Sequence, residues 1–352
     1  MTEYVEGNIL EADAQALVNT VNTVGIMGKG IALQFKKAFP EMFGEYEAAC
    51  DREEVEMGKM HIFDRGGLFN PRYIINFPTK KHWKGKSKIE HIQAGLRDLI
   101  NRVKGLHITS IAVPPLGCGH GGLNWDEVRP LIVEAFEELP DVRVLIYQPT
   151  GAPAPEAQLN RTERPAMTAS RANVVRVLSR YCVLGYQLTL LEVHKLLYFL
   201  QVGGEPLRLR FTKETYGPYA DNLRHVLHKL EGHFTLGFGD GRNSPTTPLR
   251  LMPDALQEAE QFLASQQKSG SETEQRLERV TQLIEGFESP YGLELLASVH
   301  WVATHPEEQA TDPDLVVRAI QSWNDRKRRT MKPEHVRIAW QHLRKKGWIS
   351  GS

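Results

Sequence analysis

The sequence predicts two domains, an α/β domain with a mixed, largely parallel sheet and then a domain that is mainly helical. Up to residue 150, short β-branched runs alternate with apolar patterns of helical period, whereas after residue 168 the helical patterns dominate. Between them, residues 149–168 hold four prolines and few large apolar side chains, which is typical of a linker. We therefore expect domains over residues 1–150 and 169–352, joined by a linker over residues 151–168.

The first domain is expected to alternate strands with helices. Helices are predicted after Gly30, Ser87 and Asn124. Ser87 and Glu90 have the spacing of a capping box, and Asn124 begins its helix in the same way. Sheets of this kind bind ligands where loops leave the strand ends. The expected strands are residues 16–22, 59–63, 72–77, 108–114 and 142–147.

The second domain shows no chemical motif and no internal repeat. Its few non-helical pieces include residues 210–220. A basic run at residues 326–329, together with the basic residues 344–346, suits either a contact with DNA or a solvated end of the chain. The expected helices are residues 173–184, 190–201, 220–231, 254–266, 272–287, 292–304 and 314–323.

Composition narrows the class of protein. The 43 basic and 43 acidic residues balance, so no global field attracts nucleic acid. Three cysteines, an odd and sparse set, indicate a reducing compartment. The N-terminus has no signal-peptide pattern, and no apolar run reaches the length of a membrane span. We expect a cytoplasmic protein.

Two glycine-rich loops each connect a predicted strand to a predicted helix. Gly25, Gly28 and Gly30 form the first, which lacks the Walker spacing because another glycine follows Lys29. Alone it suits a tight turn as well as a phosphate site. The second loop, residues 117–122, holds four more glycines at an equivalent strand end. Together the loops predict a clamp for a diphosphate.

A lysine-rich segment lies between these loops in the sequence. Residues 80–88 contain five lysines, with His82 and Trp83 among them. Charge alone leaves two interpretations open, a solvated loop or a rim that meets polyanion. Trp83 is available to stack on a base, and a lysine at a strand end beside other cations is a candidate nucleophile or acid. The candidate contacts with DNA are Lys81, His82, Trp83 and Lys84.

Four segments in order, residues 6–10, 17–40, 77–87 and 114–125, resemble the motifs of macrodomains, three-layer α/β/α modules that bind ADP-ribose. The resemblance is closest to the DarG-like branch of antitoxins. It implies an enzyme that removes ADP-ribose from thymidine in single-stranded DNA, hydrolysing an N-glycosidic bond and reversing a DarT-like toxin. It also implies that residues 169–352 bind and neutralise that toxin. The alternative is a reader that binds ADP-ribose without cleaving it.

The resemblance also implies roles for individual residues. Lys80 takes the catalytic position with Thr79 beside it, and Asn8 and Ile9 hold the adenine. Asn8 stands where the family has aspartate, and Gly121 replaces an aspartate of the branch that acts on protein esters, so a lysine/aspartate pair is not assumed. The remaining contacts implied for ADP-ribose are Thr20, Val21, Asn22, Gly28, Gly30, Ile31, Ala32, Leu33, Gln34, Gly117, Cys118, Gly119, His120 and Gly121.

The chemistry expected of Lys80 has two forms. A neutral amine can attack the anomeric carbon and form a transient imine, whereas a protonated amine can stabilise the departing base. We expect Lys81 to lower the pKa of Lys80 and so favour the neutral form. Cys118 is expected to pack under its loop, and His120 is the reserve acid. The histidines show no ligand spacing, so neither metal nor cofactor is expected.

Overall fold

The computed structural model describes residues 1–67, 69–182, 187–241, 243–266, 270–308 and 310–350. Two compact units divide the chain. The first is Met1–Glu163 together with Gly239–Arg242, and the second is Arg164–Phe238 together with Asn243–Ser352. This division falls within the proline-rich stretch, while the domain limits at residues 150 and 168 stay predictions.

A six-stranded sheet forms the centre of the first unit, in the order β1-β6-β5-β2-β4-β3. Neighbouring strands run parallel except β3 and β4, which are antiparallel. The prediction of a mixed, largely parallel sheet is therefore confirmed. The edge strand β1, whose side chains alternate between exposed and half-buried, was not predicted. The strands are β1 (Thr2–Val5), β2 (Ala16–Asn22), β3 (His61–Asp64), β4 (Tyr73–Lys80), β5 (Ser110–Val113) and β6 (Arg143–Tyr147).

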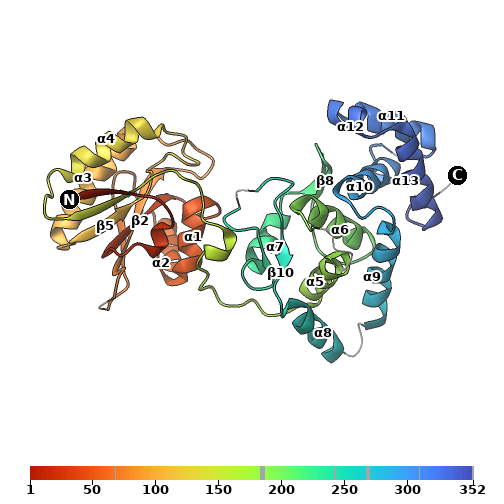
Figure 1. Cartoon of the computed structure of the whole chain (residues 1–352), viewed down its shortest axis with the longest axis horizontal. Coiled ribbons are helices and arrows are strands. Elements are labelled where there is room, and N and C mark those ends of the chain that lie inside the picture. Colours follow the sequence, from red (N-terminus) through yellow and green to blue (C-terminus); the bar gives the residue numbers. More distant parts are fainter. Residues whose placement is uncertain (68, 183–186, 242, 267–269, 309, 351–352) are drawn as a thin grey trace. The chain divides into compact units, whose positions relative to one another are not determined.

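Helices cover both faces of this sheet, which gives three layers (Figure 1). Leu17 of β2 faces the apolar side chains of α1 (Gly30–Ala38) and α2 (Pro40–Asp51). Its neighbour Val18 points to the opposite face, into the core formed with α3 (Ile89–Gly105) and α4 (Trp125–Phe136). Strands buried on both faces explain the continuous apolar runs in the sequence.

Of the two helix caps predicted in this unit, the cap at Asn124 forms and the capping box at Ser87 does not. Asn124 caps α4, since its Oδ1 accepts from the Asp126 N–H at 3.0 Å. The capping box at Ser87 does not form: α3 begins at Ile89 after Lys88, with no side-chain cap. Ser87 instead donates its backbone N–H to the Gly121 oxygen at 3.0 Å. A tertiary contact with the second glycine loop has displaced the local cap.

A close contact between α3 and β4 holds the strand that ends in Lys80. A Cβ atom added at Gly95 of α3 would lie 2.2 Å from Cζ of Phe77 in β4. The helix therefore rests directly on the phenyl ring, and only glycine leaves room for that contact.

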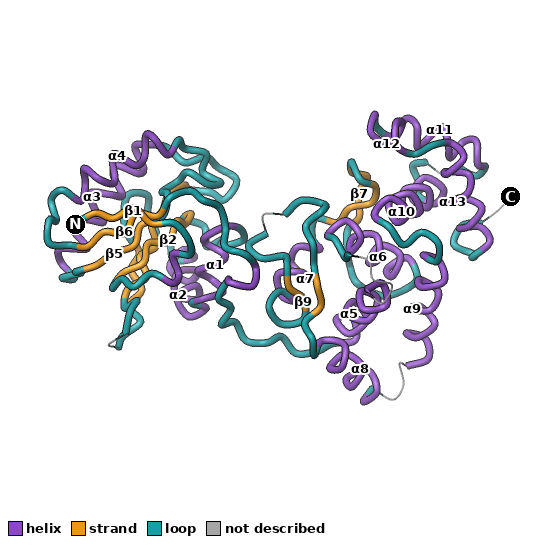
Figure 2. Tube along the Cα trace, viewed as in Figure 1, coloured by secondary structure: helices purple, strands orange, loops and turns teal. Residues whose placement is uncertain are grey.

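The second unit is mainly helical, as predicted, with a β-hairpin formed by β7 (Phe211–Glu214) and β8 (Gly217–Ala220) and a short pair, β9 (Thr235–Leu236) and β10 (Arg250–Leu251) (Figure 2). All the expected helices form, although residues 183–184 lie outside the described residues. The structure adds α12 and α13. No helix among the described residues is long and apolar enough to cross a membrane. The helices are α5 (Ala169–Cys182), α6 (Leu190–Val202), α7 (Leu223–Leu230), α8 (Ala255–Ser265), α9 (Gly270–Ile284), α10 (Pro290–Thr304), α11 (Pro313–Trp323), α12 (Asp325–Thr330) and α13 (Pro333–Lys345).

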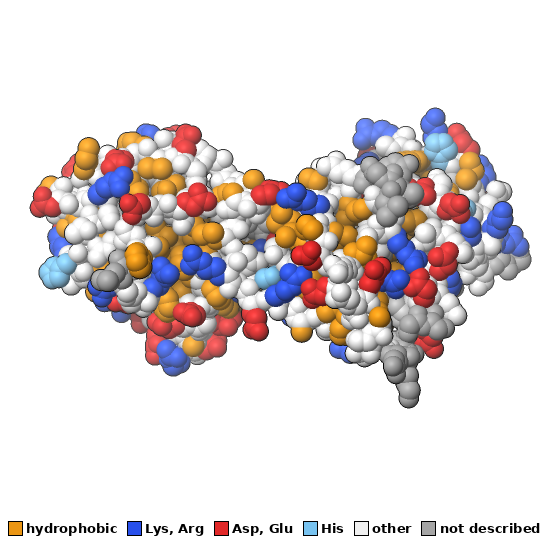
Figure 3. Space-filling model, turned by 60° about the horizontal axis from the view of Figure 1, so that its bottom comes forward, with side chains coloured by type: hydrophobic (Ala, Val, Ile, Leu, Met, Phe, Trp, Pro, Cys, Tyr) orange, Lys and Arg blue, Asp and Glu red, His pale blue; other side chains and the backbone are white. Residues whose placement is uncertain are grey.

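The basic run at residues 326–329 lies on α12 and is partly buried. Lys327 is fully buried, and its Nζ donates to Glu294 at 2.6 Å and to the Ser298 hydroxyl at 2.9 Å. Arg326 pairs with the same carboxylate at 2.6 Å. Lys327 is therefore neither solvated nor accessible to DNA, which corrects both interpretations for that residue, while Arg326 is half-buried. Elsewhere, acidic and basic side chains intermingle on the face shown in Figure 3.

Candidate active site

Three adjacent parallel strands, β5, β2 and β4, end at the same edge of the sheet. The second glycine loop follows β5, the first follows β2, and the lysine-rich segment follows β4. Asn22 and Lys80 are register partners at the last positions of β2 and β4. The sheet thus brings together the three segments that the sequence predicted to act together.

Lys80 is half-buried at the end of β4, and its Nζ donates to the Trp83 carbonyl at 3.1 Å. Burial, followed by the positive charge of Lys86, lowers the pKa of its ammonium. Both causes disfavour the charged form, so more of the amine is neutral at a given pH. The expected lowering is present, but the charge responsible belongs to Lys86 and not to Lys81.

Asn22 holds the first loop. Its Oδ1 accepts from the N–H groups of Val24 (2.9 Å) and Ile26 (3.3 Å), and its Nδ2 donates to the Ile26 oxygen at 2.6 Å. The Tyr46 hydroxyl donates to the Asn22 carbonyl at 2.6 Å. The amide is therefore a scaffold for the loop, and its contact with a ribose stays a prediction. Sequence reasoning missed Tyr46.

Two further hydrogen bonds connect the ends of β2 and β4. The Thr79 hydroxyl, which is buried, donates to the Val21 oxygen at 3.3 Å. The backbone N–H and the hydroxyl of Thr23 both donate to the Lys81 oxygen, at 3.1 and 3.0 Å. Thr20 is half-buried in the same strand end. The first loop and the lysine-rich segment are consequently held against each other.

The first loop leads directly into α1. Gly25 and Gly30 have φ angles of +73° and +62°, in the region that favours glycine, while Gly28 is exposed. The Lys29 side chain makes no cap bond. Gly30 donates its N–H to the backbone oxygen of Asp240 at 3.0 Å, within the first unit as defined above. Of the other predicted contacts, Ile31 and Ala32 are half-buried, and Leu33 and Gln34 are buried.

The second loop has no space for the carboxylate that the resemblance would place at Gly121. A Cβ atom there would lie 2.2 Å from the Ser87 hydroxyl and 2.3 Å from the Gly117 oxygen. Gly119 and His120 are exposed. Burial raises the pKa of the Cys118 thiol to about 11, which favours the protonated thiol over the nucleophilic thiolate at neutral pH.

Asn8 precedes the 3₁₀ helix η1 (Ile9–Glu11) and caps it. Its Oδ1 accepts from the Leu10 N–H at 3.1 Å, and its Nδ2 donates to Glu11 at 3.0 Å and to the Ala157 oxygen at 3.2 Å. Ile9 is buried. The amide hydrogen-bonds within the protein through both its oxygen and its nitrogen, and its contact with adenine stays a prediction.

The candidate DNA contacts form an exposed surface beyond Lys80. Lys81, His82, Trp83 and Lys84 are all exposed. The His82 and Trp83 rings are 5.3 Å apart, and the Lys84 ammonium lies 4.9 Å from the centre of the indole. A cationic surface with an accessible aromatic ring is suited to single-stranded nucleic acid.

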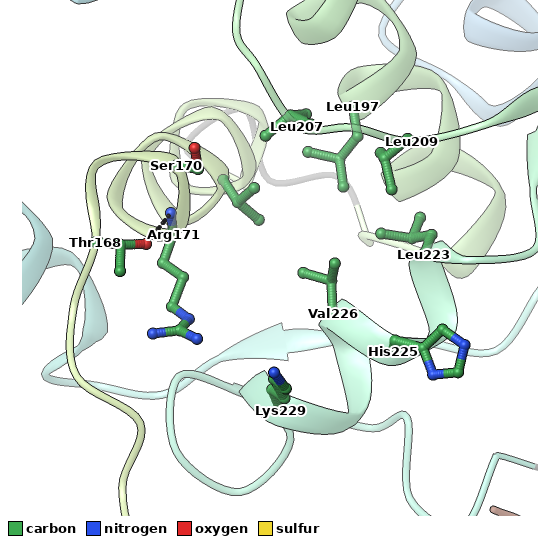
Figure 4. Close-up of a pocket in the computed structure, with 11 residues that line it drawn as sticks. Thr168, Ser170, Arg171, Leu197, Leu207, Leu209, Leu223, His225, Val226 and Lys229 are labelled. Atoms are coloured by element: carbon green, nitrogen blue, oxygen red, sulfur yellow. Dashed lines mark hydrogen bonds between the residues drawn. The ribbon is translucent and has the colours of Figure 1, made fainter.

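A separate pocket lies within the second unit, between α5, α6 and α7 (Figure 4). Its apolar walls include Leu197, Leu223 and Val226. Arg171 and Lys229 add positive charge. No sequence pattern pointed to it, because its lining comes from positions that are distant in the chain.

Comparisons with known proteins identify the family. The Macro domain model matches residues 18–132. A Thermus aquaticus protein named DNA ADP-ribosyl glycohydrolase is 46% identical over 347 residues, covering 99% of this chain and 94% of the relative. A Thermosipho africanus protein named as a fusion of DNA ADP-ribosyl transferase and DNA ADP-ribosyl glycohydrolase is 37% identical over 171 residues, 44% of each chain.

Among solved structures, the macrodomain of Mycobacterium tuberculosis DarG is 58% identical, with a TM-score of 0.42, covering 43% of this chain and 99% of that one. The identity to the Thermus aquaticus relative extends along nearly the whole length of both chains. The chain belongs to the DarG family of DNA ADP-ribosyl glycohydrolases.

Proposed function

We propose that this protein removes ADP-ribose from thymidine in single-stranded DNA by hydrolysing the N-glycosidic bond, as the antitoxin of a DarT-like toxin. The observation that carries the proposal is Lys80, half-buried opposite Asn22 at the sheet edge from which both glycine loops also leave. The name of the Thermus aquaticus relative supports the activity. The Thermosipho africanus fusion supports the pairing with a transferase.

The lowered pKa of Lys80 favours nucleophilic attack by a neutral amine. The amine nitrogen bonds to the anomeric carbon of the ribose, and the bond from that carbon to the thymine nitrogen breaks. The electron pair leaves with the base, which takes up a proton. Loss of the amine proton and opening of the ribose ring give an imine, and water then hydrolyses it to free ADP-ribose and lysine.

The glycine loops contribute by positioning. Backbone N–H groups at the start of a helix and in a glycine-rich turn suit a diphosphate, because they approach it closely and carry no competing side chain. Holding the diphosphate fixes the anomeric carbon near Lys80, which lowers the entropic cost of attack. Lys81, His82, Trp83 and Lys84 would engage the DNA strand on the outer side.

The decisive experiment measures release of ADP-ribose from a single-stranded oligonucleotide that carries ADP-ribosylated thymidine. Lys80→Ala should abolish release, while Lys88→Gln, which removes a charge eight residues away, should preserve it. A near-normal rate for Lys80→Ala would refute the role of Lys80. Tight binding of ADP-ribose by the wild-type protein without any release would favour the reader that only binds.

We further propose that the second unit binds the toxin. The Thermus aquaticus relative matches across both units, which indicates that the helical unit accompanies the glycohydrolase domain in this family. The full-length Lys80→Ala protein separates the two activities, because it lacks hydrolysis but keeps the second unit. It should still copurify with a DarT-like toxin and reduce its activity on DNA. Failure to form a complex would reject toxin binding.

A further inference from the structure

We propose that the pocket between α5, α6 and α7 binds a small anionic amphiphile, an aliphatic chain of about ten carbons that ends in a carboxylate or a phosphate. The pocket belongs to the second unit alone, so this site is independent of the glycohydrolase reaction proposed above. Three features define the ligand, namely the chemistry of the walls, the volume that they enclose and the charge at the mouth.

The walls of the pocket are aliphatic. Val174 of α5, Leu197 of α6, Leu209 and Leu223 of α7 all line it and are buried. A nucleobase would need aromatic rings on which to stack, and none of the described lining residues is Phe, Tyr or Trp. The walls therefore favour a flexible aliphatic chain over a nucleotide.

The volume of the pocket sets the length of that chain. It is about 250 Å³. An apolar cavity of roughly 150 Å³ holds benzene, so a volume larger by about two-thirds suits a chain of roughly ten carbons. A single aliphatic side chain from a docked protein segment would leave much of this space empty. The volume therefore favours a small molecule over a protein segment.

Positive charge gathers on one side of the pocket. In Figure 4, Arg171 and Lys229 lie across from the leucines of the wall. The lining residues that the structure describes include no Asp or Glu. The hydroxyl of the lining residue Ser170 donates to the buried carboxylate of Glu205 at 3.2 Å, but Arg276 pairs with that carboxylate at 3.5 Å and balances its charge. The surplus is positive, which is complementary to an anionic head group.

An amphiphile satisfies both parts of the pocket at once. Its chain would be removed from water against Leu197 and Leu223, while its charged head would stay at the mouth, where Lys229 is exposed. A wholly apolar ligand would make no use of the positive charge. An inorganic anion alone would leave the aliphatic walls unfilled.

Isothermal titration calorimetry of the full chain with sodium decanoate tests the site. Binding should be saturable with one ligand per chain. Octanoate should bind about 15-fold more weakly, because each of the two missing methylene groups contributes about fourfold. The uncharged 1-octanol should bind at least fivefold more weakly than octanoate. Decyl phosphate is titrated in parallel, and the tighter of the two ten-carbon ligands identifies the head group as a carboxylate or a phosphate.

Variants of the lining locate the binding. The double variant Arg171→Gln/Lys229→Gln should weaken decanoate binding at least tenfold. Val226→Phe, at a half-buried position of the wall, should fill the pocket and weaken binding by a similar factor. The control Lys332→Gln/Lys345→Gln removes two exposed cations elsewhere in the second unit and should match the wild type. Thermal melting of each variant verifies folding.

Three results would overturn the proposal. The first is that neither decanoate nor decyl phosphate binds saturably, and a loss of toxin binding by Arg171→Gln/Lys229→Gln in that case would make the pocket a protein contact. The second is a decanoate affinity that Val226→Phe leaves unchanged, which would place the ligand elsewhere. The third is equal affinity for 1-octanol and octanoate, which would remove the preference for an anion. Because each readout is binding to the second unit, none of these results bears on the role of Lys80.

Discussion

Asn22 and Lys80 are register partners at the carboxyl ends of β2 and β4, just past a shift in register between Val21 and Asn22. Asn22 uses its amide to hold the first loop, and Lys80 presents its amine at the same edge. The residue that shapes the loop and the residue proposed to react therefore occupy matched positions. A displacement of either strand end alters both.

Replacing Asn22 should damage the first loop. Asn22→Ala removes three part-buried hydrogen bonds to the backbone of Val24 and Ile26, so the free energy of unfolding should fall by about 1–3 kcal/mol. Calorimetric titration should also show weaker binding of ADP-ribose. Asn22→Asp keeps the oxygen that accepts from Val24 and Ile26, so it should lose less stability than Asn22→Ala. Equal stability of Asn22→Ala and the wild type would contradict the scaffold role.

Gly121→Ala should disable the second loop. The added methyl group would meet the backbone oxygen of Gly117 as well as the Ser87 hydroxyl, so the backbone itself must move. Release of ADP-ribose should fall at least tenfold, with a lower melting temperature. Gly44→Ala is the control, because nothing lies within 4 Å of its added Cβ and alanine favours the helix. It should be as active as the wild type and equally or more stable.

Cys118 should be slow to react despite its place in the second loop. Its pKa of about 11 means that only a minute fraction is thiolate at pH 7.5. Alkylation by iodoacetamide, followed by mass spectrometry, should be much slower at this position than for a free thiol and should accelerate as the pH approaches 10. Rapid alkylation of Cys118 at neutral pH, together with loss of activity, would contradict this prediction and support a catalytic role for the thiol.

In the second unit, Glu294 should be essential for stability. Glu294→Gln leaves the fully buried Lys327 without its counter-charge, which typically costs about 3–5 kcal/mol. Urea denaturation measures the change. Asp325→Asn, at an exposed pair with Arg328, is the control and should change stability little. Similar losses of unfolding free energy for the two variants would show that the buried pair contributes no more to stability than the exposed one.

Lys195 should make the second unit more stable as the pH rises above neutral. Burial, with a smaller effect from Lys327, lowers its folded pKa to about 7, while its unfolded value stays near the ordinary ~10.4. Between these values the unfolded chain binds more protons, so the free energy of unfolding increases with pH. Urea midpoints measured from pH 7 to pH 9 should rise for the wild type and stay flatter for Lys195→Met.

The sequence was most informative where the pattern is short and local. The strand of residues 16–22 forms with those limits, because its continuous apolar run reflects burial on both faces. The two glycine loops were visible because each clusters several glycines between a predicted strand and a predicted helix, and the second loop favoured a phosphate site over an ordinary turn. Lys80 was singled out by its place at a strand end and by resemblance, and the register that pairs it with Asn22 appeared only in the fold.

Long-range contacts account for the errors. Ser87 has the spacing of a helix cap, yet it is held by Gly121, which is 34 positions later in the chain. Lys81 was expected to lower the pKa of Lys80 because it is adjacent in sequence, but the pKa is lowered by burial and then by the charge of Lys86, six residues along the chain. Lys327 looked solvated within a basic run, and its burial against Glu294 is set by a different helix. A local sequence pattern cannot identify partners that are distant in the chain.

The contact between Gly95 and Phe77 has a consequence for protein engineering. The Phe77 ring packs against Gly95, a position with no side chain. This contact fixes the register of β4 relative to α3, because a shift of the strand would bring Phe77 against a larger residue of the helix. Anyone grafting the reactive lysine onto a new scaffold must carry the helix along with the strand. The segment that keeps the strand of this lysine in place therefore spans residues 73–105, from β4 through α3.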